Sequence, residues 1–216
     1  MRHSIDNLIS IASEPIGEVF DGTEALNKWG RLGNELAEML KLKNGFYAYE
    51  SALLVRPVRH DHAPLGLLEW NDPRRWKAEY ADNLGSELFF AEDVFGGQYC
   101  IRDDSISTFD PETGLFEAMC PSLRTWAGQV MSDFQMRTGY PLAHDWQMVN
   151  GALPLGVRLL PKKPFVCGGR YELDNLYSLV DVEGMRYRAS IANQIRALPD
   201  GAEIVFKTRD DTPLGM

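Results

Sequence analysis

Residues 88–122 read LFFAEDVFGGQYCIRDDSISTFDPETGLFEAMCPS, and this stretch decides the fold. Short apolar and aromatic runs alternate in it with turn sequences, which is typical of strands joined by hairpins. In the turn at Asp110-Pro111-Glu112-Thr113-Gly114, proline presets one backbone dihedral and glycine accepts a left-handed conformation. A second turn is expected at Asp103-Asp104-Ser105. The stretch therefore predicts an antiparallel meander with strands Leu88–Ala91, Gln98–Arg102, Ile106–Phe109 and Leu115–Cys120.

Helical patterns lie on both sides of the meander in the sequence. Before it, apolar residues recur at spacings of three and four, at Leu26, Trp29, Gly33, Leu36 and Leu40. After it, a helix is expected to begin at Ser122 as N-cap and to end at Gly139-Tyr140-Pro141. Its predicted buried stripe is Leu123, Trp126, Val130 and Phe134. A short helix is expected over 142–149, and the apolar segment 46–58 fits a helix or a strand.

The last third of the chain returns to strands, predicted at Val157–Leu160, Phe165–Cys167 and Leu176–Val182. A helix from about Glu183 and a closing strand at Glu203–Lys207 are expected to follow. Strands and helices do not alternate regularly, so a doubly wound parallel sheet is disfavoured. The pattern predicts an α+β fold with a central antiparallel sheet flanked by helices that pack on one face. We expect one domain over 1–216, with a helical part at 1–45 and a strand–helix–strand extension at 151–209.

The acidic residues are concentrated in the meander. The chain has a formal net charge of −9, and residues 87–117 carry eight acids and one base, Arg102. Residues 151–209, in contrast, carry nine bases and six acids. A negative balance argues against nucleic acid as a ligand, since phosphates require a basic surface. The meander acids fit either a solvated sheet face or a docking surface for a basic partner.

Several features are typical of a cytoplasmic protein. Residues 1–13 contain no long apolar run and carry Asp6, unlike a signal peptide. No segment approaches the length of a membrane span. The three cysteines, Cys100, Cys120 and Cys167, are widely spaced and odd in number, so we interpret them as reduced thiols.

Motifs with known chemistry are scarce. The nucleophile elbow, the phosphate-binding glycine loops and the His-Glu-x-x-His pair do not occur. His60-Asp61-His62, with His144-Asp145, is the best metal candidate, and a polar loop is the alternative interpretation. Glu92-Asp93 and Asp103-Asp104 are candidate carboxylate pairs or ordinary turn acids. Trp70 and Trp76 are candidates for a ring-binding site or for the core.

The order of short motifs resembles the SUKH superfamily. The resemblance is carried by Phe89-Phe90-Ala91-Glu92-Asp93-Val94-Phe95-Gly96-Gly97-Gln98, then by Phe109-Asp110-Pro111-Glu112-Thr113-Gly114, and then by Ser122-Leu123-x-x-Trp126. It extends through Gly168-Gly169-x-Tyr171 and Gln194-Ile195-x-x-Leu198-Pro199-Asp200-Gly201, to cover roughly residues 30 to 207. It implies an α+β fold with a central sheet, no cofactor, no metal and a role in protein binding.

Many bacterial members of that superfamily resemble immunity proteins that neutralise a toxin, often a nuclease. We therefore expect a non-enzymatic immunity-type protein, monomeric or homodimeric, that occludes a cognate toxin with a basic surface and binds neither nucleic acid nor membranes. A regulatory scaffold with several partners and a metal-dependent hydrolase are the alternatives. The expected interface consists of the acids Glu92, Asp93, Asp103, Asp104, Asp110 and Glu112 and the aromatic anchors Trp70 and Trp76.

Overall fold

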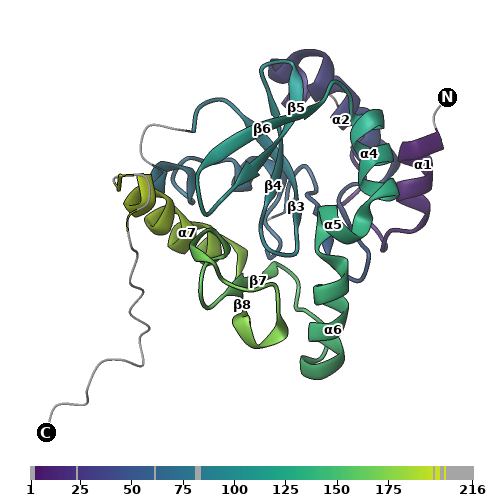
Figure 1. The fold of residues 1–216 in the computed structure, drawn as a ribbon. Helices are drawn as coiled ribbons and strands as arrows, with labels where there is room; N and C mark the ends of the chain where they lie inside the picture. Colours follow the sequence, from purple (N-terminus) through teal and green to yellow (C-terminus); the bar gives the residue numbers. More distant parts are fainter. Residues whose placement is uncertain are drawn as a thin grey trace, which may run out of the picture.

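The computed structural model describes residues 3–22, 24–60, 62–80, 84–196, 198–199 and 202. Its central feature is a six-stranded antiparallel sheet whose strands follow one another in chain order (Figure 1). The strands are β1 (Phe46–Ala48), β2 (Leu53–Val55), β3 (Leu88–Asp93), β4 (Gln98–Arg102), β5 (Ser105–Asp110) and β6 (Leu115–Cys120). The predicted meander is confirmed, and the segment at 46–58 adds two short strands to it.

Helices surround this sheet in an α+β arrangement, as the sequence predicts. They are α1 (His3–Ser10), α2 (Gly30–Leu42), α3 (Leu67–Trp70), α4 (Leu123–Ser132), α5 (Phe134–Thr138), α6 (Tyr140–Asn150) and α7 (Asp181–Arg196). Short 3-10 turns lie at η1 (Glu24–Trp29), η2 (Lys77–Glu79), η3 (Phe165–Cys167) and η4 (Leu173–Asn175). Within the described residues, no helix is both long and apolar enough to cross a membrane.

The central strands are buried on both faces. Leu88 and Phe90 of β3 pack into a core shared with α1, α2 and α4. Phe89 lies between them in the strand and packs on the other side, against Met185 and Ala189 of α7. Figure 1 shows α1, α2 and α4 on the right of the sheet and α7 at its lower left. The expectation that helices pack on one face is therefore wrong, because α7 returns to cover the second face.

The two predicted long helices are both interrupted. Gly30 has a φ of +60°, so the front helix is divided into η1 and α2 there. Ser122 is the N-cap of α4, as predicted, and its hydroxyl accepts a hydrogen bond from the Thr125 amide at 3.1 Å. Phe134 does not extend the stripe of α4. It begins α5, and its ring stacks on Tyr49 with the centroids 4.7 Å apart.

The C-terminal part forms its own two-stranded antiparallel sheet, β7 (Val157–Pro161) with β8 (Leu176–Val180), followed by α7. The strand predicted at Phe165–Cys167 is wrong, because this segment is the 3-10 turn η3, closed by Gly168 at a φ of +77°. The expected boundary near Glu183 shifts to Asp181, where β8 gives way directly to α7. The closing strand predicted at Glu203–Lys207 lies outside the described residues.

Candidate functional site

Trp70 and Trp76 are both fully buried, so they cannot anchor a partner from the surface. Their rings lie 5.2 Å apart, and Trp76 also contacts Phe89 of β3. The reason is that residues 67–79 fold back over the sheet as α3 and η2 and do not form an open loop. The expectation that these tryptophans belong to the partner interface is wrong.

Glu92 is also removed from the surface, by a buried network of charged side chains. Its carboxylate contacts Arg158 Nε at 2.6 Å and Arg56 Nη2 at 3.0 Å. Asp181 contacts the same Arg56 nitrogen at 2.9 Å, and Gln98 Nε2 donates to Glu92 at 2.8 Å. We call Arg56, Glu92, Arg158 and Asp181 the buried network. It joins β3, β7 and α7 to Arg56, the residue that follows β2, so Glu92 is structural.

The pKa values within the buried network follow the number of arginine partners. Burial alone would raise the pKa of Glu92, but Arg56 and Arg158 outweigh it, and the pKa lies below its ordinary value. Asp181 has one arginine within ion-pair distance, Arg56, and burial keeps the pKa of this carboxyl raised. The two arginines and the Gln98 hydrogen bond together favour the charged form of Glu92, whereas the charge of Glu92 adds to the raised pKa of Asp181.

The remaining acids do not lie together on one sheet face. Asp103 and Asp104 are exposed at the β4–β5 turn, with φ values of +47° and +57°. Asp110 ends β5, so it lies at the opposite end of that strand. Its carboxylate accepts the Glu112 amide at 2.8 Å and so fixes the β5–β6 turn. The acidic meander is therefore two separate groups of acids.

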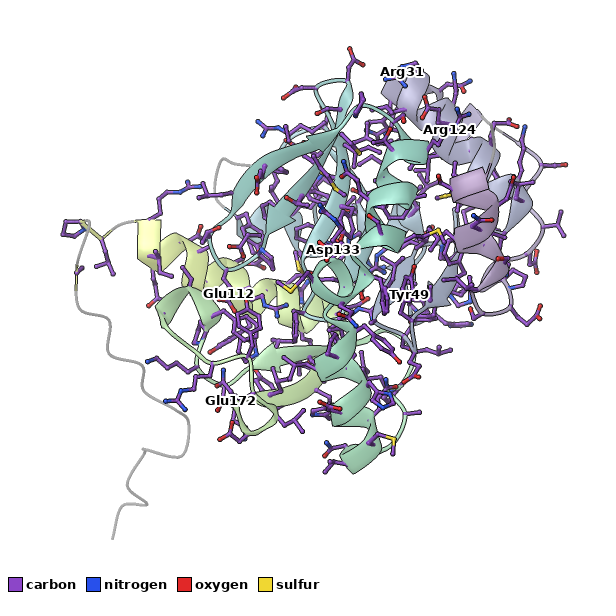
Figure 2. All side chains as sticks on the ribbon, turned by 45° about the vertical axis from the view of Figure 1, so that its right-hand side comes forward. Arg31, Tyr49, Glu112, Arg124, Asp133 and Glu172 are labelled. Atoms are coloured by element: carbon purple, nitrogen blue, oxygen red, sulfur yellow. The ribbon has the colours of Figure 1, made fainter. Side chains whose placement is uncertain are left out.

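One of these groups lines a cleft with a volume of about 630 Å³. Asp93, Asp110 and Glu112 contribute to it from the β3–β4 and β5–β6 turns. Other lining residues include Met136 and Arg137 of α5, Phe165 and Val166 of η3, Tyr171 of the segment that follows η3, and Arg188 of α7. In Figure 2, Glu112 and Asp133 mark the two sides of this cleft. The fold therefore brings three of the six predicted interface acids together.

Asp93 is half-buried at this cleft. One carboxylate oxygen, Oδ1, accepts the backbone amides of Phe95 and Gly97, each at 2.8 Å. The structure shows no hydrogen bond to Oδ2 from the described residues. Burial raises the pKa of Asp93 to about 7, although both amides and Arg188 act in the other direction.

Glu112 is more deeply buried than Asp93, with 5% of its surface exposed, and its carboxylate also accepts a hydrogen bond from the backbone. Its Oε2 accepts the Val166 amide at 2.9 Å, which holds the η3 segment against the β5–β6 turn. The Phe165 amide also acts on this carboxylate. Burial raises the pKa of Glu112 despite that backbone contact and the nearby charge of Arg188.

Arg188 supplies a cation at the cleft from α7, with 3% of its surface exposed. Its single hydrogen bond runs from Nη2 to the Leu159 carbonyl at 3.4 Å. In the described part of the chain, no carboxylate lies within 4.0 Å of this guanidinium. Nη1 lies directly over Gly96, where an added Cβ would approach it to 2.6 Å. Gly96 therefore lets the Arg188 guanidinium approach the backbone closely.

An aromatic wall completes the cleft. Phe165 and Tyr171 stack with their centroids 3.9 Å apart and an interplanar angle of 7°, and Phe95 meets both rings edge-on. Tyr171 is 62% exposed, and Met136 and Val166 are exposed beside the same cleft. Large apolar side chains exposed around a polar cavity are typical of a binding surface.

The histidines do not converge on a metal site. His60 Nδ1 lies 3.1 Å from the His62 carbonyl oxygen and 3.0 Å from that of Pro64, both hydrogen-bond acceptors, whereas His144 Nδ1 contacts Glu50 at 2.8 Å on the β1–β2 turn. Asp61 lies outside the described residues. Within the described ranges, no group of three His, Cys, Asp or Glu side chains is placed to hold a metal ion.

Sequence reasoning missed Arg188 and the aromatic wall. A signal for Arg188 exists, since Asp181, Met185, Arg188 and Ala192 recur at helical spacing on one buried stripe. A charged residue in an otherwise apolar stripe indicates a buried polar contact. Phe165 and Tyr171 have no comparable pattern, because a 3-10 turn and an irregular segment position them.

The comparisons with known proteins establish the fold alone. No protein-family model matches the chain, and no curated protein matches it by sequence. The crystal structure of Atu4351 from Agrobacterium tumefaciens resembles it with a TM-score of 0.57. The similarity covers 88% of each chain at 13% sequence identity. The α+β architecture is therefore shared with a solved protein over most of its length.

Proposed function

We propose that this chain is a cytoplasmic, non-enzymatic immunity-type protein that neutralises a cognate toxin by occluding it, and that its cleft receives part of the toxin. The observation that carries the proposal is an open cleft in which the acids Asp93, Asp110, Glu112 and Asp133 outnumber the two arginines, beside the exposed rim of Tyr171, Met136 and Val166. Protein interfaces combine this kind of aromatic and methionine surface with polar groups at defined positions. The resemblance to the SUKH superfamily supports the same role.

The charge of the chain supports a basic partner. A net charge of −9 attracts a basic protein over a distance and raises the rate of encounter. A nuclease carries a basic substrate groove, which complements this charge, so nucleases are the toxin class that we propose. Asp103 and Asp104 at the exposed β4–β5 turn would contribute to attraction, and the cleft would contribute to the stability of the complex.

The test is co-expression with the protein encoded by the neighbouring gene, followed by affinity purification and calorimetric titration. We expect one tight complex, and we expect the double variant Tyr171→Ala, Met136→Ala to weaken it at least tenfold. Both side chains are exposed, so the variant should retain the thermal unfolding temperature of the parent. The matched control is Met148→Ala, at an equally exposed methionine on α6 outside the cleft.

Two results would contradict the proposal. Unchanged affinity of the folded double variant would remove the cleft from the interface. Several weak partners in place of one tight partner would favour the regulatory scaffold over the immunity role.

A further inference from the structure

The cleft and the buried network contain the same chemical groups in different numbers. The buried network holds two carboxylates and two guanidinium groups within ion-pair distance of one another. The cleft is lined by four carboxyls, Asp93, Asp110, Glu112 and Asp133, and by two guanidinium groups, Arg137 and Arg188. Carboxyls therefore outnumber guanidinium groups in the cleft, whereas their numbers are equal in the network.

The network shows how this fold binds arginine. Arg56 donates to two carboxylates, and its guanidinium plane lies 3.4 Å from the centroid of the Trp70 ring. Carboxylate oxygens at the edge and an aromatic ring on the face are the two contacts that suit a planar guanidinium. Glu92 also binds Arg158, so two guanidinium groups around one carboxylate are compatible with this structure.

The cleft offers the same two contacts without an arginine in them. Asp93 Oδ2 accepts no hydrogen bond from the described residues, and the buried Glu112 carboxylate is engaged by backbone amides, those of Val166 and Phe165, with no arginine within ion-pair distance in the described part of the chain. The exposed Tyr171 ring lines the same cleft as Asp93, Asp110 and Glu112. The carboxyls and the ring therefore belong to one site.

We infer that the cleft is a receptor for a single guanidinium group, an arginine side chain that the partner projects between the carboxylates of Asp93 and Glu112 and against the Tyr171 ring. This inference rests on the proposed function, since it names the residue with which the toxin enters. Lysine fits less well, because an ammonium group has no flat face and cannot bridge two carboxylates in a fork.

The test uses Nα-acetyl-L-arginine amide as the probe, titrated into the isolated full chain and followed by NMR chemical-shift changes and calorimetry. We expect saturable binding with a dissociation constant on the order of 1 mM, as is usual for a ligand of this size. The citrulline analogue has the same shape without the charge and should bind at least tenfold more weakly. The lysine analogue should bind several-fold more weakly than the arginine probe.

The variants locate the site. Glu112→Gln keeps the size of the side chain and an acceptor for the Val166 amide, and it should reduce arginine binding at least fivefold. Tyr171→Ala, at an exposed position, should do the same without affecting folding. Asp103→Asn removes a charge outside the cleft lining and should leave probe binding unchanged. Equal binding of the arginine and citrulline probes, or no saturation by either in the folded protein, would overturn the inference.

The outcomes for the receptor and for the immunity role are separable. If the arginine probe binds in the cleft but no toxin partner is found, the receptor stands and the proposed function fails. If a toxin binds tightly and its affinity survives Glu112→Gln, the proposed function stands and the arginine receptor is wrong.

Discussion

Glu92 and Asp93 are neighbours on β3, yet they lie in two chemically different regions. Glu92 belongs to the buried network, where two arginines hold its pKa below the ordinary value. Asp93 lines the cleft, has no arginine within ion-pair distance among the described residues, and has a pKa of about 7. The difference shows that guanidinium partners offset the cost of burying the Glu92 carboxylate, whereas acids outnumber arginines in the cleft.

The largest expected effect comes from breaking the buried network. Glu92→Gln removes one charge from a buried pair and leaves Arg56 and Arg158 without their shared carboxylate. We expect the free energy of unfolding to fall by about 3 to 5 kcal/mol, which is typical when one partner of a buried ion pair is lost. Urea unfolding followed by circular dichroism measures the change. Glu117→Gln at an exposed position of β6 is the control, and a loss for Glu92→Gln as small as that of the control would contradict the structural role of the network.

A smaller effect is expected from the pH dependence of Asp93. Its pKa is raised from 3.8 to about 7 in the folded chain, so folding favours the protonated form. The contribution to stability is full below pH 4 and is lost as the pH rises to about 7. The free energy of unfolding of wild type should therefore fall by on the order of 2 kcal/mol relative to that of Asp93→Asn across this range, after allowance for partial exposure of the group. Urea unfolding of both proteins at several pH values measures this. A constant difference in unfolding free energy between them from pH 4 to pH 8 would contradict this assignment.

The different surroundings of Glu92 and Asp93 cannot be predicted from the sequence alone, although much of the fold can. The meander, the α4 cap at Ser122 and the α+β class follow from local patterns, because turns and caps depend on residues close in sequence. The burial of Glu92 does not follow from local patterns, because its partner Arg158 lies 66 residues away, in the C-terminal part of the chain. Alternation in a strand places Glu92 and Asp93 on opposite faces, but it does not show that α7 covers one of them.

A comparison of aromatic residues in the two regions sharpens this difference further. Trp70 lies under Arg56 in the network and donates from Nε1 to Gln98 at 3.1 Å. Trp70→Phe keeps a ring but loses this hydrogen bond and part of the packing, so we expect a loss of about 1 to 2 kcal/mol in stability. Tyr171→Phe in the cleft should change stability by less than about 0.5 kcal/mol, since its hydroxyl makes no hydrogen bond with the described residues. Thermal unfolding of both variants measures whether the Trp70 ring contributes more to stability than the Tyr171 hydroxyl.

The smallest expected effect belongs to the exposed acids of the β4–β5 turn. Asp103 carries a weak contact to Arg102 at 3.4 Å, and both it and Asp104 are open to solvent. Asp103→Asn with Asp104→Asn should leave stability unchanged, because exposed ion pairs contribute little. We expect the association rate with a basic partner to fall about two- to fivefold at low salt, and the difference to disappear as salt screens the charges. Stopped-flow association at several ionic strengths measures this, with dissociation as the internal control. A change confined to the dissociation rate would place the turn inside the interface, and the cleft would then not be the main contact.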